Sequence, residues 1–200
     1  MQNADREKEY SAIILAAGKS ERLGFPKLSL KYNENTNFIE HIVSEYQQYG
    51  CKDIIVVINN MGNKCLIDND IYFFDIAKVV INEHPDWHRY YSLKLGAKQV
   101  KENHFVFIHN VDNPFVNQEI LDELLIYSEK ADYISPEFDR KGGHPFLISS
   151  KVIHDLKASD VDQMHLKEFL NKYSRKRVSV TDENILVNIN TLEEYRKYFE

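Results

Sequence analysis

Short apolar runs that do not alternate with polar residues recur along the chain. They cover residues 12–15, 54–58, 79–81 and 105–108. Such runs are typical of strands that are buried on both faces, as in parallel sheets. Between them, apolar residues return every three or four positions, which predicts helices. This alternation predicts an α/β fold with three layers, α/β/α, around a mostly parallel, Rossmann-like sheet.

The helical pattern is clearest over residues 38–46. Asn37 and Glu40 have the spacing of a capping box before it, and Gly50 can end the helix. Other amphipathic patterns predict helices over residues 91–100, 120–125, 164–173 and 192–199. Further strands are expected at residues 145–148, 178–180 and 185–189. We expect a single domain over residues 1–200, with residues 1–10 as a flexible N-terminus.

The loop after the first predicted strand carries the chain's most informative chemistry. Residues 15–27 read LAAGKSERLGFPK. Gly18 and Gly24 allow a ligand close to the backbone, whose free N–H groups can cradle an anion, and Arg22 and Lys27 add positive charge. This predicts a phosphate-binding loop. Its spacing matches neither the Walker pattern nor the dinucleotide pattern Gly-x-Gly-x-x-Gly.

The ordered series Leu-Ala-Ala-Gly-x-Ser-x-Arg-Leu-Gly-x-Pro-Lys resembles the signature loop of the MobA-like NTP transferase family. These are nucleotidyltransferases with a GT-A-like fold, and the molybdenum cofactor cytidylyltransferase branch is the most similar. The resemblance implies that Arg22 and Lys27 act in catalysis by holding a triphosphate. It also implies a set of nucleotide-binding residues in the loop: Leu15, Ala16, Ala17, Gly18, Lys19 and Ser20.

Asp112 follows the predicted strand at residues 105–108, and Pro114 closes the turn. An aspartate in such a place can serve the turn alone, because its side chain bonds nearby backbone. The family carries Asp-x-Pro here, which implies that Asp112 is a catalytic Mg²⁺ ligand. Mg²⁺ prefers oxygen ligands and often uses one or two carboxylates together with substrate phosphates.

Asn188 and Asn190 lie two residues apart at the end of the predicted strand 185–189, where both can point to one face. The resemblance implies that both are metal ligands. The cytidylyl branch has aspartates here, whereas Asn-x-Asn is similar to guanylyl and sugar-nucleotidyl relatives; an amide oxygen binds a cation without adding charge. Part of this motif has a structural alternative, since Thr191 and Glu194 have the spacing of a capping box.

Two shorter segments extend the resemblance. Ser92 matches a family serine near the start of a helix beside the nucleotide base. Gly143 and His144, followed by Pro145, match a Gly-His-Pro of the cofactor cytidylyl branch, which implies acceptor binding. Residues 88–91 (HRYY) stand where the family carries small residues, so the pocket is expected to differ in shape.

Composition excludes several classes of function. The net charge of −6 argues against nucleic acid as the main partner. The sequence has no run of 18 apolar residues and begins without an apolar leader, so we expect neither a membrane span nor a signal peptide. Cys51 and Cys65 lack metal-ligand spacing, which favours a reduced, cytoplasmic protein. A basic group, Lys172, Arg175, Lys176 and Arg177, is interpreted as solvated surface without a role.

The resemblance implies Mg²⁺-dependent transfer of a nucleoside monophosphate from an NTP to a phosphorylated acceptor, with release of pyrophosphate. Ala17 favours CTP, because guanylyl relatives more often have glycine there and a methyl group would crowd a purine. The implied acceptor is the molybdopterin cofactor. We also expect transient contact with an enzyme that receives the finished cofactor, and a monomer or dimer. Two alternatives stay open: transfer to a sugar or alcohol phosphate for surface polysaccharide or lipid precursors, and a non-catalytic nucleotide or cofactor carrier.

Overall fold

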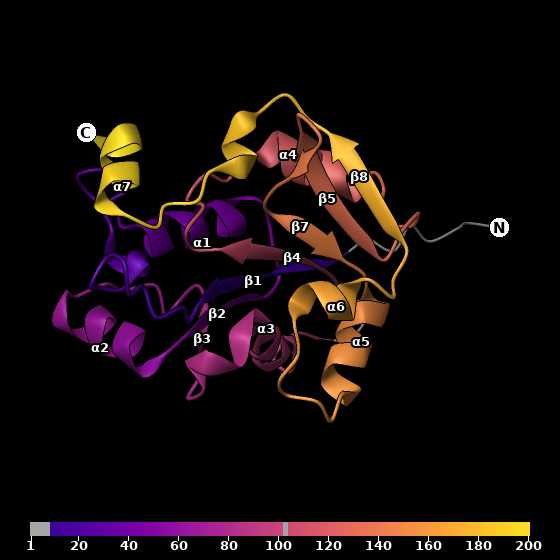
Figure 1. The fold of residues 1–200 in the computed structure, drawn as a ribbon, viewed down its shortest axis with the longest axis horizontal. Coiled ribbons are helices and arrows are strands. Elements are labelled where there is room, and N and C mark those ends of the chain that lie inside the picture. The colour runs from indigo at the N-terminus through magenta and orange to yellow at the C-terminus, as the bar shows by residue number, and fades with distance from the viewer. Residues whose placement is uncertain (1–8, 102–103) are drawn as a thin grey trace.

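A mixed sheet lies between two layers of helices in the computed structural model, which describes residues 9–101 and 104–200 (Figure 1). Its strand order is β3-β2-β1-β4-β7-β5-β6, and β8 pairs with β5. The strands are β1 (Tyr10–Ala16), β2 (Ile54–Ile58), β3 (Lys78–Ile81), β4 (Phe105–Asn110), β5 (Tyr133–Phe138), β6 (Lys141–Gly142), β7 (Phe146–Ile148) and β8 (Arg175–Ser179). The predicted α/β fold class is confirmed.

One half of the sheet is parallel. Strand β1 pairs in parallel with both β2 and β4, and β2 pairs in parallel with β3. Strand β7 is antiparallel to β4 and β5, whereas β8 runs parallel to β5. The register places Leu15 beside Asn110. The loop that follows β1 and the turn that follows β4 therefore meet at one edge, where open α/β sheets bind ligands.

Helices cover both faces of the sheet. They are α1 (Phe38–Gln48), α2 (Asn60–Asp68), α3 (His88–Ala97), α4 (Gln118–Leu125), α5 (Ser150–Ala158), α6 (Leu166–Leu170) and α7 (Leu192–Phe199). Along β1, Ala12 and Ile14 pack with α1, α2 and α4, whereas Ile13 and Leu15 pack with α3, α5 and α6. Each strand thus buries both faces, as its apolar run predicts. No helix in the described ranges is both long and apolar enough to cross a membrane.

Two predicted capping boxes are present. Asn37 and Glu40 form one at the start of α1, and Thr191 and Glu194 form the other at the start of α7. Gly50 follows the end of α1 with a φ of 92°, a backbone conformation that glycine adopts without a steric penalty. These local signals place both helices correctly because they satisfy backbone groups that the helix itself leaves unpaired.

One predicted element is wrong, and another is shorter than predicted. Residues 185–189 do not form a strand; instead a 3₁₀ helix, η3, covers Glu183–Leu186. It begins where the side chain of Asp182 accepts a hydrogen bond from the Asn184 backbone N–H. The helix expected over residues 164–173 is only α6, because the chain turns after Leu170 to pair β8 with β5.

Several elements lie outside the sequence predictions, namely α2, α5, β5 and the two-residue β6. Strand β5 contains Pro136, a residue that is depleted in strands. The expected flexible N-terminus falls largely on residues 1–8, which lie outside the described residues, while Tyr10 already opens β1.

Candidate active site

The loop after β1 is anchored by a side chain from the neighbouring strand end. Asn59, directly after β2, donates to the backbone carbonyls of Ala17 (3.0 Å) and Gly18 (3.3 Å). Its Oδ1 accepts from the Gly62 N–H (2.7 Å), which caps α2. Farther along the loop, Ser20 has a φ of 53°, and its carbonyl accepts two backbone N–H groups. These bonds hold a tight loop at the carboxyl edge of the sheet.

The Lys27 side chain contacts both of the predicted metal-ligand motifs, the one at Asp112 and the one at Asn190. Its Nζ donates to Asn190 Oδ1 at 2.6 Å and lies 3.5 Å from Asp112 Oδ2. The side chains of Lys27 and Asp112 are only 14% and 24% exposed, so this ion pair is shielded from water. The other carboxylate oxygen, Asp112 Oδ1, is buried and has no hydrogen-bond partner. An unpaired buried carboxylate oxygen is costly, and a bound cation would satisfy it.

Buried hydrogen bonds fix the turn that carries Asp112. The Ile189 N–H donates to the Asp112 carbonyl (2.7 Å), which brings Asn190 next to the turn. His109 Nε2 donates to the Asn113 carbonyl (2.6 Å), and the Tyr46 hydroxyl lies 2.8 Å from His109 Nδ1. Burial lowers the pKa of His109 to about 4. The ring is therefore neutral near pH 7 and acts as a rigid spacer between α1 and the turn.

A cavity of about 100 Å³ unites much of the predicted site. Predicted residues that line it are Leu15, Ala16, Ala17, Gly18, Ser20, Lys27, Ser92 and Asp112. Ser92 is buried on α3 and accepts a hydrogen bond from Asn82, which directly follows β3. Arg89 and Asn110 also line the cavity but are absent from the predicted set. Of the bulky residues 88–91, Tyr90 is core, so its size does not narrow this cavity.

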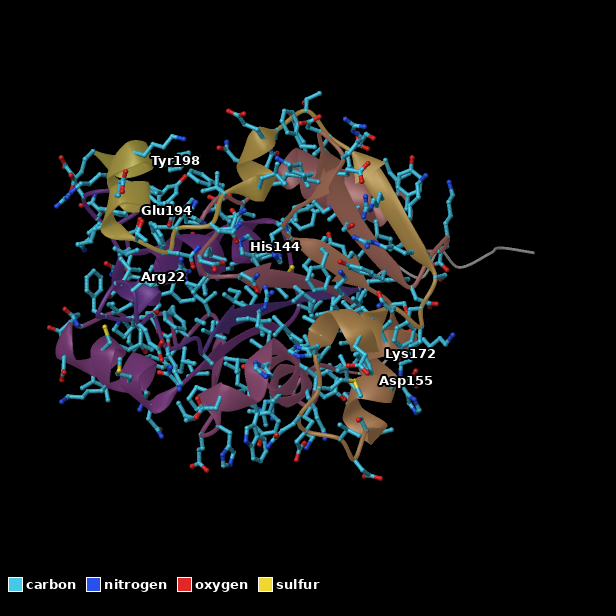
Figure 2. All side chains as sticks on the ribbon, viewed as in Figure 1. Arg22, His144, Asp155, Lys172, Glu194 and Tyr198 are labelled. Carbon is cyan, nitrogen blue, oxygen red and sulfur yellow. The ribbon has the colours of Figure 1, made fainter. Side chains whose placement is uncertain are left out.

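Lys19 and Arg22 lie apart from this cluster. Lys19 is exposed and pairs with Asp86, whose hydrogen bond raises the Lys19 pKa. It lines a second, larger cavity of about 430 Å³ together with Asn59, Asn82 and Glu83. Arg22 is exposed and makes no side-chain hydrogen bond or ion pair to the described part of the chain. Figure 2 places it toward the side of the molecule that carries Glu194 and α7.

Asn188 does not join Asn190 beside Asp112. It is exposed, and its amide donates to the Leu186 carbonyl at 2.9 Å. The amide of Asn190 instead donates to the Asn188 backbone carbonyl. Because residues 185–189 are not a strand, the expectation that both side chains share a strand face is wrong.

His144 and Gly143 have different environments. His144 Nε2 accepts from the Asn110 amide at 2.9 Å, while its buried Nδ1 has no partner. Burial, and secondarily the charge of Arg89, lowers the His144 pKa to about 4. Gly143 has a packing reason to be glycine, because a Cβ there would lie 2.4 Å from the Ile185 carbonyl oxygen.

The arrangement combines a shielded lysine, a carboxylate with a free buried oxygen, and a loop whose backbone lines the same cavity. These groups can bind a polyanion together with a divalent cation. Residues 9–101 and 104–200 contain no group of three or more His, Cys, Asp or Glu side chains placed to hold a metal. A cation at Asp112 would therefore take most of its remaining ligands from the bound polyanion.

Asn59 and Asn82 could have been found from the sequence. Each directly follows a predicted buried strand, as the loop at residues 15–27 and the turn at Asp112 do. Because parallel strands end at one edge, polar residues just after several such strands converge. That positional signal needs no motif.

Comparisons with known proteins identify the family. The sequence profile of the MobA-like NTP transferase domain matches residues 12–178. A probable molybdenum cofactor guanylyltransferase of Clostridium perfringens is 26% identical over 197 residues, covering 92% of this chain and 93% of the relative. A 2-C-methyl-D-erythritol 4-phosphate cytidylyltransferase of Clostridium acetobutylicum is 30% identical over 129 residues, covering 60% of this chain and 53% of the relative.

The fold is also similar to solved structures. The Rv0371c protein of Mycobacterium tuberculosis superposes with a TM-score of 0.81 at 20% identity, over 96% of this chain and 97% of the neighbour. The same protein in complex with manganese gives a TM-score of 0.76 at 19% identity, over 96% and 98% of the two chains. These likenesses establish the shared fold.

Proposed function

This chain belongs to the MobA-like NTP transferase family and is a nucleotidyltransferase. We propose the following reaction and site for it. It transfers a nucleoside monophosphate from an NTP to a phosphorylated acceptor and releases pyrophosphate. The observation that carries this proposal is the contact of Lys27 with Asn190 and Asp112 beside the loop after β1.

In this proposal the acceptor phosphate attacks the α-phosphorus of the NTP, and the bond to the β-phosphate oxygen breaks. The acceptor needs no general base, because the second pKa of a phosphate monoester is about 6 and the group is largely ionised at neutral pH. Loop amides from Ala17 to Ser20 and the Lys27 ammonium hold the triphosphate and offset charge on the departing pyrophosphate. Catalysis then rests on positioning and charge stabilisation. Arg22 would have to turn inward when nucleotide binds.

The residues present fit a divalent cation, for which we propose Mg²⁺. Asp112 Oδ1, buried and unpaired, would hold it, with Asn190 Oδ1 as a neutral second oxygen. Asn188 lies outside this pair of oxygens, because its amide would first have to release the Leu186 carbonyl. The cation would supply positive charge against the triphosphate. Only one carboxylate is offered, so we expect weak metal binding until nucleotide is bound.

We propose the molybdenum cofactor as the acceptor, because a relative that covers nearly the whole chain is named for it. An alcohol phosphate is the second candidate, since a cytidylyltransferase named for such an acceptor matches 60% of the chain. Gly143 and His144 would lie beside the acceptor. Because His144 is neutral near pH 7, it would hold an acceptor oxygen by a hydrogen bond and not by an ion pair.

For the nucleotide we propose CTP, because Ala17 is among the residues that line the smaller cavity, and a glycine there would leave more room for a purine. Two observations favour GTP instead. The relative that covers nearly the whole chain is named a guanylyltransferase, and Glu83 lines the larger cavity with its carboxylate unpaired among the described residues. A carboxylate can accept the N–H groups of guanine. Comparing kcat/KM for CTP and GTP decides between them, and Glu83→Gln should lower only a GTP-dependent rate.

Pyrophosphate release tests the proposed site. The protein is incubated with CTP or GTP, Mg²⁺ and each candidate acceptor. Lys27→Ala and Asp112→Ala should each lower the rate by about 10²-fold or more, the size of losing a transition-state contact, with the circular dichroism spectrum unchanged. Lys64→Ala, which changes an exposed lysine on α2, is the control and should match the parent. Release that persists in both site variants would contradict the assignment.

A further inference from the structure

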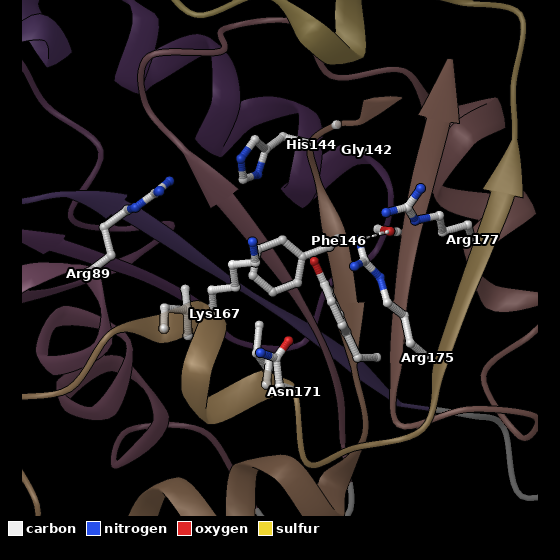
Figure 3. Close-up of a pocket in the computed structure, with 13 residues that line it drawn as sticks. Arg89, Gly142, His144, Phe146, Lys167, Asn171, Arg175 and Arg177 are labelled. Atoms are coloured by element: carbon white, nitrogen blue, oxygen red, sulfur yellow. Dashed lines mark hydrogen bonds between the residues drawn. The ribbon is translucent and has the colours of Figure 1, made fainter. Parts of the chain in front are cut away.

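A third cavity, of about 340 Å³, lies next to the smaller cavity that contains Lys27 and Asp112 (Figure 3). It lies between strand β8, helix α6 and the start of α3, and His144 and Phe146 form part of its wall. Four cationic side chains line it from three elements: Arg89, Lys167, Arg175 and Arg177. No Asp or Glu is among its lining residues. In a chain of net charge −6, this local excess of positive charge predicts an anionic ligand.

The alternation of side chains along β8 contributes to this local excess of positive charge. Arg175 and Arg177 point to the cavity side, whereas Lys176 lies over the ring of Tyr127 on the other side. The basic group that the sequence presents as solvated surface is therefore divided by the strand. Lys172 lies outside the cavity, near Asp155 (Figure 2).

Three of the four cationic side chains of the cavity have no acidic partner among the described residues. The Arg175 guanidinium lies 4.8 Å from the Tyr133 ring centroid and 3.4 Å from Ser135 Oγ, and both contacts are uncharged. Arg177 pairs with Glu137 at 2.5 Å, so part of its charge is offset. Arg89 and Lys167 have no side-chain hydrogen bond or ion pair within the described ranges. Three cations thus remain available to a ligand.

The cavity adjoins the smaller cavity that contains Lys27 and Asp112. Arg89 lines both of them. Asn110, which lines the smaller cavity, donates to His144, which lines this one. A molecule seated here would therefore lie next to the proposed site of nucleotidyl transfer.

We propose that this cavity binds a second anionic group of the acceptor, distinct from the phosphate that attacks the nucleotide. The inference rests on the proposed function and deepens it: the acceptor class is a phosphorylated molecule that carries a further phosphate, carboxylate or other oxyanion. Arg175 and Lys167 are its specificity-determining residues. Guanidinium and ammonium groups favour such oxyanions through charge-assisted hydrogen bonds.

Calorimetric titration with two matched probes tests this. The protein is first saturated with α,β-methylene-CTP (or the GTP analogue) and Mg²⁺, which fills the triphosphate site. Fructose 1,6-bisphosphate and fructose 6-phosphate, which differ by one phosphate, are then titrated separately. The bisphosphate should bind at least about tenfold more tightly, because one additional charge-assisted hydrogen bond contributes about that much to affinity.

Variants separate the cavity from adventitious binding. Arg175→Gln and Lys167→Ala should each remove most of the preference for the bisphosphate. Lys176→Gln, on the opposite side of β8, should keep it. Equal affinity for the two probes, or an unchanged preference in Arg175→Gln with an unchanged melting temperature, would overturn the inference. Failure of the parent protein to bind either nucleotide analogue would instead overturn the proposed function.

Discussion

At the scale of single residues, Lys27 organises the site. Its ammonium contacts Asn190 and Asp112, which come from two distant segments, so one side chain links the loop after β1, the turn after β4 and the segment before α7. In the proposed reaction, the Lys27 ammonium would neutralise the Asp112 carboxylate before substrate binds and then contact a phosphate oxygen. The buried Asp112 Oδ1 has no hydrogen-bond partner, and in the proposed site it would hold the metal ion.

Asn190 and Asn188 should differ in their importance. Asn190→Ala removes the 2.6 Å partner of Lys27, so we expect a rise of about tenfold in KM for the NTP or a similar fall in kcat. Asn188→Ala should stay within about twofold of the parent, because its side chain bonds only the Leu186 carbonyl in this structure. Steady-state kinetics at saturating Mg²⁺ measures both. Equal damage from the two substitutions would show that Asn188 also reaches the substrate or metal.

The sequence identifies the chemistry of single residues better than their partners. Lys27 and Asp112 follow from the loop and from the position after a strand, and the structure brings them together. The proximity of Asn110 to His144, and of Asn59 to the loop, depends on strand order, which local patterns do not contain. Arg89 belongs to the cavities only because α3 presents it there, while its neighbour Tyr90 is buried.

At the scale of elements, the turn before β7 packs tightly on η3. Gly143→Ala would place a Cβ 2.4 Å from the Ile185 carbonyl oxygen, so we expect a loss of about 2–3 kcal/mol in the free energy of unfolding. Gly142→Ala is the matched control, with 3.5 Å to the flexible Arg175 side chain and an expected change below about 1 kcal/mol. Urea unfolding measures both. If Gly143→Ala keeps its stability but loses acceptor binding, then Gly143 serves the ligand and not the packing.

Elements with strong local signals are predictable, and elements decided by tertiary context are not. Buried apolar runs and capping boxes locate β1, β2, α1 and α7. Residues 185–189 (ILVNI) are mostly apolar, as strands often are, yet the Ile189 N–H donates to the Asp112 carbonyl and not to a neighbouring strand. Conversely, β5 tolerates Pro136 because β7 and β8 supply the pairing around it. Strand propensity expresses fit to neighbours, which one segment cannot reveal.

At the scale of the whole molecule, two chemically different pockets meet at one edge of the sheet. Parallel strands β1, β2, β3 and β4 bring the loop, Asn59, Asn82 and Asp112 to that edge. The antiparallel part, β7 and β5, together with β8, adds the cationic cavity. Arg89 lines both sides of the junction. In the proposed reaction, the pyrophosphate would leave from the smaller cavity and the acceptor would occupy the cationic one.

Stability should fall as the solution is acidified. Burial lowers the pKa of both His109 and His144 to about 4, whereas an unfolded histidine titrates near about 6.5. Between these values the unfolded chain binds protons that the folded chain does not, so the free energy of unfolding decreases as pH decreases. For His109 alone the loss reaches about 3 kcal/mol at the acid end. The lowered pKa values of Asp132 and Asp155 act only below about pH 4.

Urea unfolding between pH 7.5 and 4.5 measures this dependence. In the His109→Gln variant, the free energy of unfolding should change less with pH than in the parent, even though the variant is less stable at pH 7.5. His165→Gln, which alters an exposed histidine with no ion pair among the described residues, is the control and should behave like the parent protein. A free energy of unfolding that stays constant or rises from pH 6.5 to 4.5 would contradict the buried, neutral state of these rings.

In the proposed reaction, the chain joins an intact nucleoside monophosphate to a phosphorylated acceptor. Mass spectrometry of the products, after incubation with α-¹⁸O-labelled CTP or GTP, Mg²⁺ and the acceptor, follows this transfer. We expect an acceptor that gains one labelled nucleoside monophosphate for each pyrophosphate released, and no such product from Asp112→Ala. Formation of free nucleoside diphosphate or monophosphate, with the acceptor unchanged, would contradict the proposed reaction.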